Sequence, residues 1–440
     1  MARRIMAVVA TTIVLVSAFP SPSHAEVTAP PTGPAPAVLS PTAVVDSTAP
    51  APTKAGVQRA VLGTLKASAL GQFSAVVIDP STDTVLLDVR AGTPRTPAST
   101  NKLLTSAAAL TVLDPASRLA TTVVATGDSI TLVGGGDATL ARTKRKGVEA
   151  ATLADLADQV SKQVVGTPVR LAYDDSLFSG PELGPGWPAS FPAAGVVAPV
   201  TALMVDQGRV RPNALSRVAN PAKQAAQVFA GLLDKRGVTV TSVRKGKAPK
   251  DATEIGRVES ATIGDLVERL LTDSENDLGE ALGHLVGGKV SGKATFATGA
   301  AGVEKTAAEL GLVTKGLSIV DGSGLSGRDR VPALTLVGVL DHVSRQTEPA
   351  LWPIGPGLPV SGFTGTLADR YGKGLSASAA GYVRAKTGTL SGVVALAGTV
   401  KDVDGRVLVF AVMANNVRSL DGARLAVDEF ASRLSKCGCS

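Results

Sequence analysis

The stretch TPASTNKLLTSAAAL, residues 96–110, carries the most information about the fold of this chain. A proline opens it, a dense apolar run follows, and Ser99 and Lys102 stand where that run begins. The spacing predicts a helix, in which positions i and i+3 share a face. A lysine in an apolar site loses part of its preference for the charged form, so it can take the proton of a serine hydroxyl. The alternative is a helix cap with a solvated lysine, and the same pattern recurs in a polar setting at Ser242–Lys245.

A second polar motif, Ser274-Glu275-Asn276, lies in a loop between two predicted short helices at 263–271 and 278–285. A hydroxyl there can relay a proton, and an amide can hold a peptide group of a substrate. The alternative interpretation is an ordinary turn of polar residues.

A third motif, Lys386-Thr387-Gly388, ends a predicted strand at 381–388 and is followed by Thr389. A lysine and a threonine at a strand edge can hold a carboxylate, and Gly388 lets a substrate backbone come close. The alternative is a strand end with an exposed lysine. The three motifs in this order are far more specific than any one of them, and they form the set found in penicillin-binding proteins and class A β-lactamases.

The chain resembles the class C low-molecular-mass penicillin-binding proteins, the D-alanyl-D-alanine carboxypeptidase/endopeptidase family, over about residues 55–436. Four further stretches are similar to that family: LVGGGDATL (132–140), DDSLFSGPELGPGW (174–187), DGSGLSGRDR (321–330) and GFTGTLADR (362–370). The long separation between Ser99 and Ser274 also fits, because family members carry an inserted region there. The insertion is shorter here than in the longest members, so the resemblance gives no residue for recognising a substrate side chain.

The resemblance implies a role for each motif residue. Ser99 would be the acylated nucleophile, Lys102 its base, and Ser274 the group that passes a proton to the leaving D-alanine. The other motif residues would bind substrate: Asn276 at its amide, Lys386 and Thr387 at its terminal carboxylate, Gly388 beside them, and Thr389 with Ser99 through backbone N–H groups that form the oxyanion hole.

The order of elements predicts an α+β fold. Strands cluster near both ends of the folded part (74–89 and 381–416), with helices between and after them, which favours an antiparallel sheet flanked by helices. The resemblance makes this the penicillin-binding/serine β-lactamase-like transpeptidase fold. We expect a discontinuous catalytic domain at 55–115 and 258–440, with an inserted α+β domain at 116–257.

The N-terminal region of the chain predicts export. Residues 1–25 have the basic start, short apolar run and small-residue cleavage site of a signal peptide, and 26–54 form a Pro/Ala-rich linker. No integral membrane span is expected after cleavage, so the protein would act in the cell envelope or be secreted. The only cysteines, Cys437 and Cys439, are expected in a frayed tail, with an intermolecular disulfide as the alternative.

Composition argues against several other functions. The formal net charge is +7, with its densest basic cluster at 142–146. In an exported protein this cluster predicts a solvated loop, or weak attraction to an anionic envelope polymer, rather than nucleic-acid binding. After signal cleavage only His284 and His342 remain, without an H-E-x-x-H motif, so neither a metal nor another cofactor is expected. A G-x-S-x-G motif is also absent.

These observations predict an exported serine-type D-Ala-D-Ala carboxypeptidase, with DD-endopeptidase action as a further hypothesis. Its partners would be peptidoglycan stem peptides, and β-lactam antibiotics would inhibit it by acylating Ser99. One alternative is a serine β-lactamase or esterase of the same fold, although no E-x-x-L-N segment marks a class A deacylation base. The other alternative is a non-catalytic envelope protein that only binds peptidoglycan.

Overall fold

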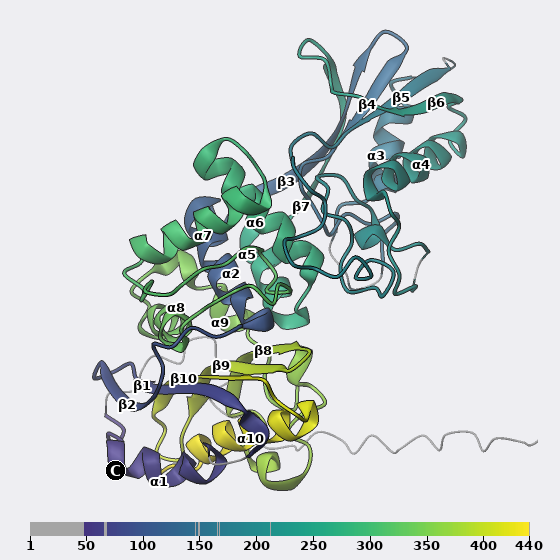
Figure 1. Ribbon diagram of the computed structural model, residues 1–440. Helices are drawn as coiled ribbons and strands as arrows, with labels where there is room; N and C mark the ends of the chain where they lie inside the picture. The colour runs from purple at the N-terminus through teal and green to yellow at the C-terminus, as the bar shows by residue number, and fades with distance from the viewer. Residues whose placement is uncertain are drawn as a thin grey trace, which may run out of the picture. The chain divides into compact units, whose positions relative to one another are not determined.

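The computed structural model describes residues 48–65, 68–145, 147, 150–164, 166, 168–211 and 213–439 (Figure 1). The predicted signal peptide and most of the predicted linker lie outside these residues. The described part contains two five-stranded sheets with helices packed on them. None of its helices is both long and apolar enough to cross a membrane.

The first sheet joins the two ends of the folded chain. Its five antiparallel strands lie in the order β2-β1-β10-β9-β8. Their bounds are β1 (Gln72–Asp79), β2 (Thr84–Val89), β8 (Val383–Leu390), β9 (Val393–Lys401) and β10 (Val407–Asn415). Because β1 pairs with β10, the first hairpin of the chain lies beside its last strand. This arrangement confirms the predicted antiparallel sheet and α+β fold.

Both faces of the first sheet are buried, and strand alternation decides which residue enters which core. Val76 and Ile78 face the core that contains α2 (Lys102–Val112) and α8 (Ala333–Arg345). Ala75 and Val77 face the opposite core, against α1 (Lys54–Leu65) and α10 (Leu420–Ser435). Central strand β10 is buried on both faces, which explains its continuous apolar sequence VLVFAVMA.

The second sheet is mixed and lies in the middle of the sequence. Its order is β6-β5-β4-β3-β7, from β3 (Arg118–Thr126), β4 (Ser129–Val133), β5 (Val169–Asp174), β6 (Val240–Lys245) and β7 (Thr253–Thr262). β5 is parallel to β4 and β6, so helical crossovers are needed, and α3 (Leu153–Ser161) and α4 (Pro221–Asp234) provide them. β7 runs past the predicted boundary at 257, and the division into domains stays a prediction.

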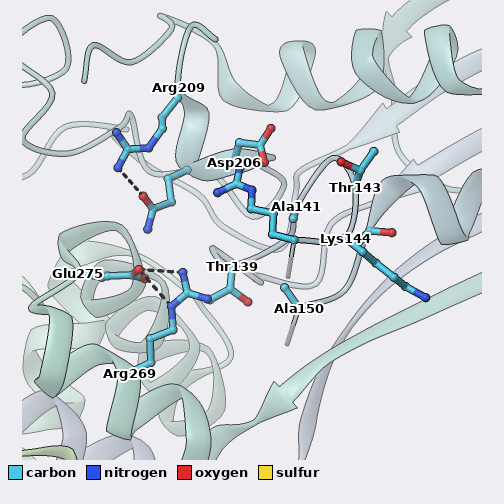
Figure 2. A pocket seen from close by; sticks show the side chains of 12 residues that line it. Thr139, Ala141, Thr143, Lys144, Ala150, Asp206, Arg209, Arg269 and Glu275 are labelled. Carbon is cyan, nitrogen blue, oxygen red and sulfur yellow. Dashed lines mark hydrogen bonds and ion pairs between the residues drawn. The ribbon is translucent and has the colours of Figure 1, made fainter. Parts of the chain in front are cut away.

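The basic cluster follows β4 and is only partly solvated. Lys144 is exposed, but Arg142 and Arg145 both pair with the buried carboxylate of Asp206 in η4 (Asp206–Gly208), and the Arg145 Nη2 to Asp206 Oδ1 distance is 2.7 Å. Figure 2 shows Lys144 and Asp206 at the wall of a cavity. The loop is therefore held by ion pairs as well as exposed to solvent.

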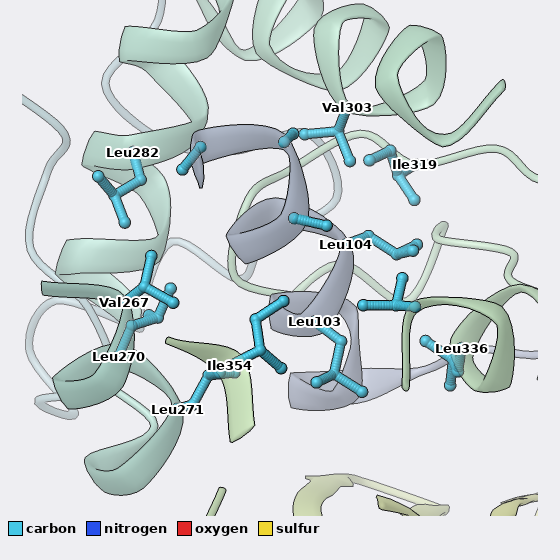
Figure 3. Close-up of a cluster of buried hydrophobic side chains, with 14 of the residues drawn as sticks. Leu103, Leu104, Val267, Leu270, Leu271, Leu282, Val303, Ile319, Leu336 and Ile354 are labelled. Carbon is cyan, nitrogen blue, oxygen red and sulfur yellow. The ribbon is translucent and has the colours of Figure 1, made fainter. Parts of the chain in front are cut away.

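The remaining helices pack around α2, in which every residue from Lys102 to Leu110 is buried. A helix that is apolar on all sides needs neighbours on all sides. Figure 3 shows Leu103 and Leu104 of α2 among side chains of the surrounding helices. These helices are α5 (Ile263–Asp273), α6 (Asn276–Ser291), α7 (Phe296–Glu309), α8 and α9 (Ile354–Gly357). Short 3₁₀ segments are η2 (Ser68–Leu70) after α1, η3 (Ala98–Asn101) before α2, η5 (Pro349–Leu351) between α8 and α9, and η6 (Gly365–Leu367) and η7 (Gly374–Ala379) between α9 and β8.

Helix α6 is longer than the predicted segment at 278–285. The glycines of α6 lower its intrinsic helix propensity, because glycine is a poor helix former. Gly283 and Gly287 pack closely on α7, where a side chain at Gly287 would clash with the backbone of Gly299. Close packing of two helices therefore overrides the low intrinsic propensity.

The prediction of a frayed C-terminal tail was wrong. Cys437 and Cys439 are buried and joined in a disulfide. The backbone N–H of Thr53 donates to the carbonyl of Cys439 over 2.6 Å, and a side chain at Gly56 would clash with the same carbonyl. The tail is held because the first turn of α1 offers it a free donor and a surface without a side chain.

Candidate active site

Ser99 lies in a tight turn clamped between two sequence-distant segments. The residue before it, Ala98, is buried and has φ +49, a conformation that costs energy for a residue with a side chain. A Cβ atom at Gly388 would lie 2.6 Å from the carbonyl oxygen of Pro97, and one at Gly324 would clash with the carbonyl oxygen of Ala98. Both neighbours must be glycine for the turn to fit, so packing fixes the position of Ser99.

The ammonium nitrogen of Lys102 connects the first and second motifs. Its Nζ lies 2.9 Å from Ser99 Oγ, 2.8 Å from Asn276 Oδ1 and 2.8 Å from the carbonyl oxygen of Ser323. The lysine is completely buried in the first turn of α2. Three oxygen atoms thus match the three N–H donors of a charged lysine, or two donors and one lone pair of a neutral one.

Burial lowers the pKa of Lys102 to about 8, against the opposing charges of Glu280, Asp321 and Asp277. An unperturbed lysine would hold its proton to well above this value. The lowered pKa leaves a minor neutral fraction of Lys102 near neutral pH, far larger than in an unperturbed lysine, and a general base must be in this neutral form.

The Ser274-Glu275-Asn276 motif occupies the break between α5 and α6. Ser274 adopts a left-handed conformation with φ +58 that ends α5, and Asn276 begins α6. Asn276 Nδ2 donates to the carbonyl of Val196 over 2.8 Å, which directs its Oδ1 towards Lys102. The amide is thereby held in one orientation.

The third motif lies on β8. Lys386 is completely buried, and its Nζ donates to the carbonyl of Thr387 over 3.1 Å. Burial, together with the positive charge of Lys102, lowers the pKa of Lys386 well below its ordinary value. Thr387 Oγ1 donates to Thr366 Oγ1 over 2.8 Å.

Residues of the first two motifs, and Thr389 directly after the third, line a cavity of about 850 Å³. Of the predicted site residues, four line it directly: Ser99, Ser274, Asn276 and Thr389. Lys102 and Lys386 lie fully buried, and Thr387 and Gly388 are buried on β8 beside the Ser99 turn. The predicted residues therefore form one constellation with a reactive hydroxyl at its surface and two lysines beneath.

Sequence reasoning missed the group that holds the third partner of Lys102. Glu280, completely buried on α6, accepts hydrogen bonds from the backbone N–H groups of Gly322 (3.0 Å) and Ser323 (2.8 Å). Burial and the nearby charge of Asp321 raise the pKa of Glu280. The sequence did contain one indication that Glu280 belongs to the site. Glu280 lies four residues after Asn276 and therefore shares its helix face.

A buried ion pair that the sequence analysis did not predict, Asp277 with Arg217, connects the middle segment of the chain to the second motif. Asp277 accepts from the N–H of Ala198 over 2.6 Å and from Arg217 Nη2 over 3.1 Å, and both charged side chains are buried. Burial raises the pKa of Asp277, and Arg217 counteracts this rise. The segment around 196–217 thus fixes the start of α6, where Asn276 lies.

A serine hydrogen-bonded to a buried lysine, set between helices and an antiparallel sheet, is the arrangement found in serine hydrolases of the penicillin-binding type. The model of the D-Ala-D-Ala carboxypeptidase 3 (S13) family matches residues 57–216 and 211–434. The chain belongs to this family and is a D-Ala-D-Ala carboxypeptidase by class.

Two mycobacterial relatives match nearly the whole chain. Carboxypeptidase DacB of Mycolicibacterium smegmatis is 36% identical, over 99% of this chain and 96% of its own length. A carboxypeptidase of Mycobacterium tuberculosis is 34% identical, over 94% of this chain and 90% of its own length. The similarity therefore includes the middle segment as well as the motifs.

The fold is that of a solved penicillin-binding protein. The crystal structure of penicillin binding protein 4 from Haemophilus influenzae matches with a TM-score of 0.72 and 20% identity, covering 87% of this chain and 99% of that one. The same protein in complex with a β-lactam matches with a TM-score of 0.68, covering 85% and 98% of the two chains. This similarity confirms the predicted penicillin-binding fold.

Proposed function

We propose that the protein is exported and removes the terminal D-alanine from peptidoglycan stem peptides through an acyl-enzyme on Ser99. The observation that carries this proposal is the set of three contacts of Lys102 Nζ with Ser99, Asn276 and Ser323. The predicted signal peptide supports export, and membership of the S13 family supports the substrate class.

The contacts of Lys102 define which way its lone pair points. A neutral lysine has two N–H donors, and the amide oxygen of Asn276 and the carbonyl of Ser323 can only accept. The remaining position on the nitrogen faces Ser99 Oγ, 2.9 Å away. Lys102 is therefore arranged to accept the serine proton, which makes the oxygen a nucleophile.

Acylation would then follow in balanced steps. Ser99 Oγ attacks the carbonyl carbon of the penultimate D-alanine, and the N–H groups of Ser99 and Thr389 stabilise the oxyanion. The proton taken by Lys102 passes through Ser274 to the amine of the leaving D-alanine as the peptide bond breaks. Lys386 and Thr387 hold the carboxylate of that D-alanine, and a water molecule later hydrolyses the ester to regenerate Ser99.

Product analysis tests this function directly. Purified protein is incubated with an uncross-linked muropeptide ending in D-Ala-D-Ala, and we expect mass spectrometry to find free D-alanine and a peptide one residue shorter. A cross-linked muropeptide in a parallel reaction reports endopeptidase action, and a chromogenic cephalosporin reports β-lactamase action. Binding of muropeptides without release of D-alanine, or rapid cephalosporin turnover without it, would contradict the proposal.

The buried carboxylate of Glu280 supplies a second test of the same network. We predict that Glu280→Gln lowers the rate of acylation by penicillin by about 10²-fold, because a displaced Ser323 carbonyl no longer orients Lys102. The ionised carboxylate of Glu280 raises the pKa of Lys102, and because the pKa of Glu280 is itself raised to about 8, the carboxylate is partly ionised across the acidic limb of the pH–rate profile. Its removal should therefore also move this limb to lower pH. Stopped-flow acylation at several pH values measures both effects.

Glu304→Gln is the matched control for this variant. Glu304 on α7 also accepts a backbone hydrogen bond, from Ile319, but its carboxylate is not among the groups that shift the pKa of Lys102. We expect its rate and pH profile to equal those of the wild type. Thermal unfolding checks that both variants are folded, and Glu280→Asp is expected to recover the position of the pH limb. An unshifted limb in Glu280→Gln would show that Glu280 does not act through Lys102.

A further inference from the structure

A second cavity, of about 210 Å³, lies behind the Ser274-Glu275-Asn276 loop. We call it the basic cavity and define it by Lys144, Arg145, Arg209 and Arg269 with the carboxylates of Asp206 and Glu275. Figure 2 shows Arg269 paired with Glu275 on one side, and Arg209, Asp206 and Lys144 on the others. The cavity therefore joins the end of α5 to two separate segments of the middle region.

The charges that line the basic cavity do not balance. Four cationic side chains face two carboxylates. The single charge of Asp206 is shared, because Arg142 and Arg145 both pair with it. Lys144 pairs with Asp155, but the lysine is largely exposed and the aspartate partly exposed, so water screens the pair.

Arg209 carries the uncompensated charge. Its guanidinium donates to two neutral oxygens, the carbonyl of Ala214 (2.7 Å) and Gln207 Oε1 (3.1 Å). Burial lowers the pKa of Arg209, and the charges of Arg217 and Arg145 lower it further, against Asp277 and Glu275. An anion at this place would relieve this repulsion and accept the planar N–H donors that arginine offers to oxyanions.

The size of the cavity limits the ligand. The cavity has room for one oxyanion together with a few water molecules. Phosphate and carboxylate groups both have the oxygen geometry that paired guanidinium groups bind. The ligand class is thus a single oxyanion presented at the end of a larger molecule or free in solution.

The basic cavity and the active site share a wall. Ser274 and Asn276 line the active-site cavity, whereas Glu275 between them lines the basic cavity. Arg269 Nε and Nη2 both donate to Glu275 Oε1, at 3.1 and 2.8 Å, and Glu275 Oε2 is buried without a hydrogen-bond partner in the described part of the chain. An anion that competes with Glu275 for Arg269 would therefore act on the loop that carries Ser274 and Asn276.

We propose that the basic cavity binds one phosphate or carboxylate group through Arg145 and Arg209, and that its occupation changes the rate of acylation through Arg269 and Glu275. The binding site is independent of the reaction, whereas the effect on rate rests on the function proposed above. The oxyanion comes either from a terminal phosphate group of an envelope polymer or from the terminal carboxylate of a neighbouring wall peptide.

Isothermal titration calorimetry with inorganic phosphate tests the site. We expect one phosphate per wild-type chain, and affinity lowered by at least about tenfold in Arg209→Gln and in Arg145→Gln. Arg244→Gln is the matched control, because it removes the same charge from the exposed face of β6, away from the cavity. Thermal unfolding without phosphate shows whether each variant is folded. If the wild type does not bind phosphate, or if Arg244→Gln loses as much phosphate affinity as the cavity variants, the proposed binding site is wrong.

Acylation by a fluorescent penicillin tests the coupling. Phosphate is compared with sodium chloride at equal ionic strength, and we expect at least about a twofold change in the wild-type rate that Arg209→Gln lacks. If phosphate binds but the acylation rate does not change, the proposed coupling is wrong, whereas the proposed binding site stands. Phosphate binding by a protein that penicillin never acylates would instead contradict the function proposed above. Titration with glycerol phosphate and with N-acetylated amino acids then distinguishes the two sources of the oxyanion.

Discussion

The Ser99→Ala variant is expected to take up no covalent label from a fluorescent penicillin and to release no D-alanine from a muropeptide. The hydroxyl of Ser99 contacts Lys102 Nζ and lines the active-site cavity, whereas that of Thr100 is buried and donates to the carbonyl of Pro97. The substitution removes one oxygen from a partly exposed position. The fold should be unaffected, so thermal unfolding should match that of the wild type. Denaturing gel electrophoresis after labelling measures the result.

Ser242→Ala provides the matched control, because Ser242 begins the second Ser-x-x-Lys sequence of the chain. It lies exposed on β6 in the second sheet, so its loss should leave labelling at the wild-type level. If the label persists in Ser99→Ala, or disappears in Ser242→Ala, the assignment of Ser99 as the nucleophile is wrong.

Lys102→Met is expected to lower the rate of acylation by about 10³-fold, which corresponds to about 4 kcal/mol of activation free energy. Methionine keeps the length and apolar character of the lysine stem but cannot accept the proton of Ser99. It also leaves Asn276 Oδ1 and the carbonyl of Ser323 without their donor. Lys305→Met, an exposed lysine on α7, should keep the wild-type rate.

The pH dependence of the acylation rate is a second measurement that tests the role of Lys102 as the base. The pKa of Lys102 is lowered to about 8, so the neutral base is the minor form below this pH and the major form above it. The wild-type acylation rate should therefore increase as the pH rises through about 8, and the residual rate of Lys102→Met should lack this limb. A wild-type rate that falls over this interval would mean that Lys102 acts in its charged form.

Several elements could be predicted from the sequence because their cause is local. The hairpin of β1 and β2, the hairpin of β3 and β4, and the last helix follow from apolar periodicity and turn residues close by in the chain. The central strand β10 was recognisable because it is apolar throughout. In each case the residues that determine the element are neighbours in sequence.

Other features depend on contacts that no local pattern contains. Helix α6 continues through its glycines because α7 packs against them, and the C-terminal tail is held by the first turn of α1. The partners of the basic loop, above all Asp206, lie far along the chain. Interactions of this kind are decided only when the chain has folded.

The candidate site divides in the same way. The sequence by itself determined which chemical groups are present: a hydroxyl, an amide, two lysines and the glycine that lets β8 approach the Ser99 turn. Tertiary structure decided what those groups can do, because Lys102 contacts Asn276, which lies 174 residues away, and contacts the carbonyl of Ser323, whose N–H donates to Glu280. The physical reason is that a proton affinity is set by burial and by the charges and dipoles within a few ångströms, and these surroundings come from distant parts of the chain.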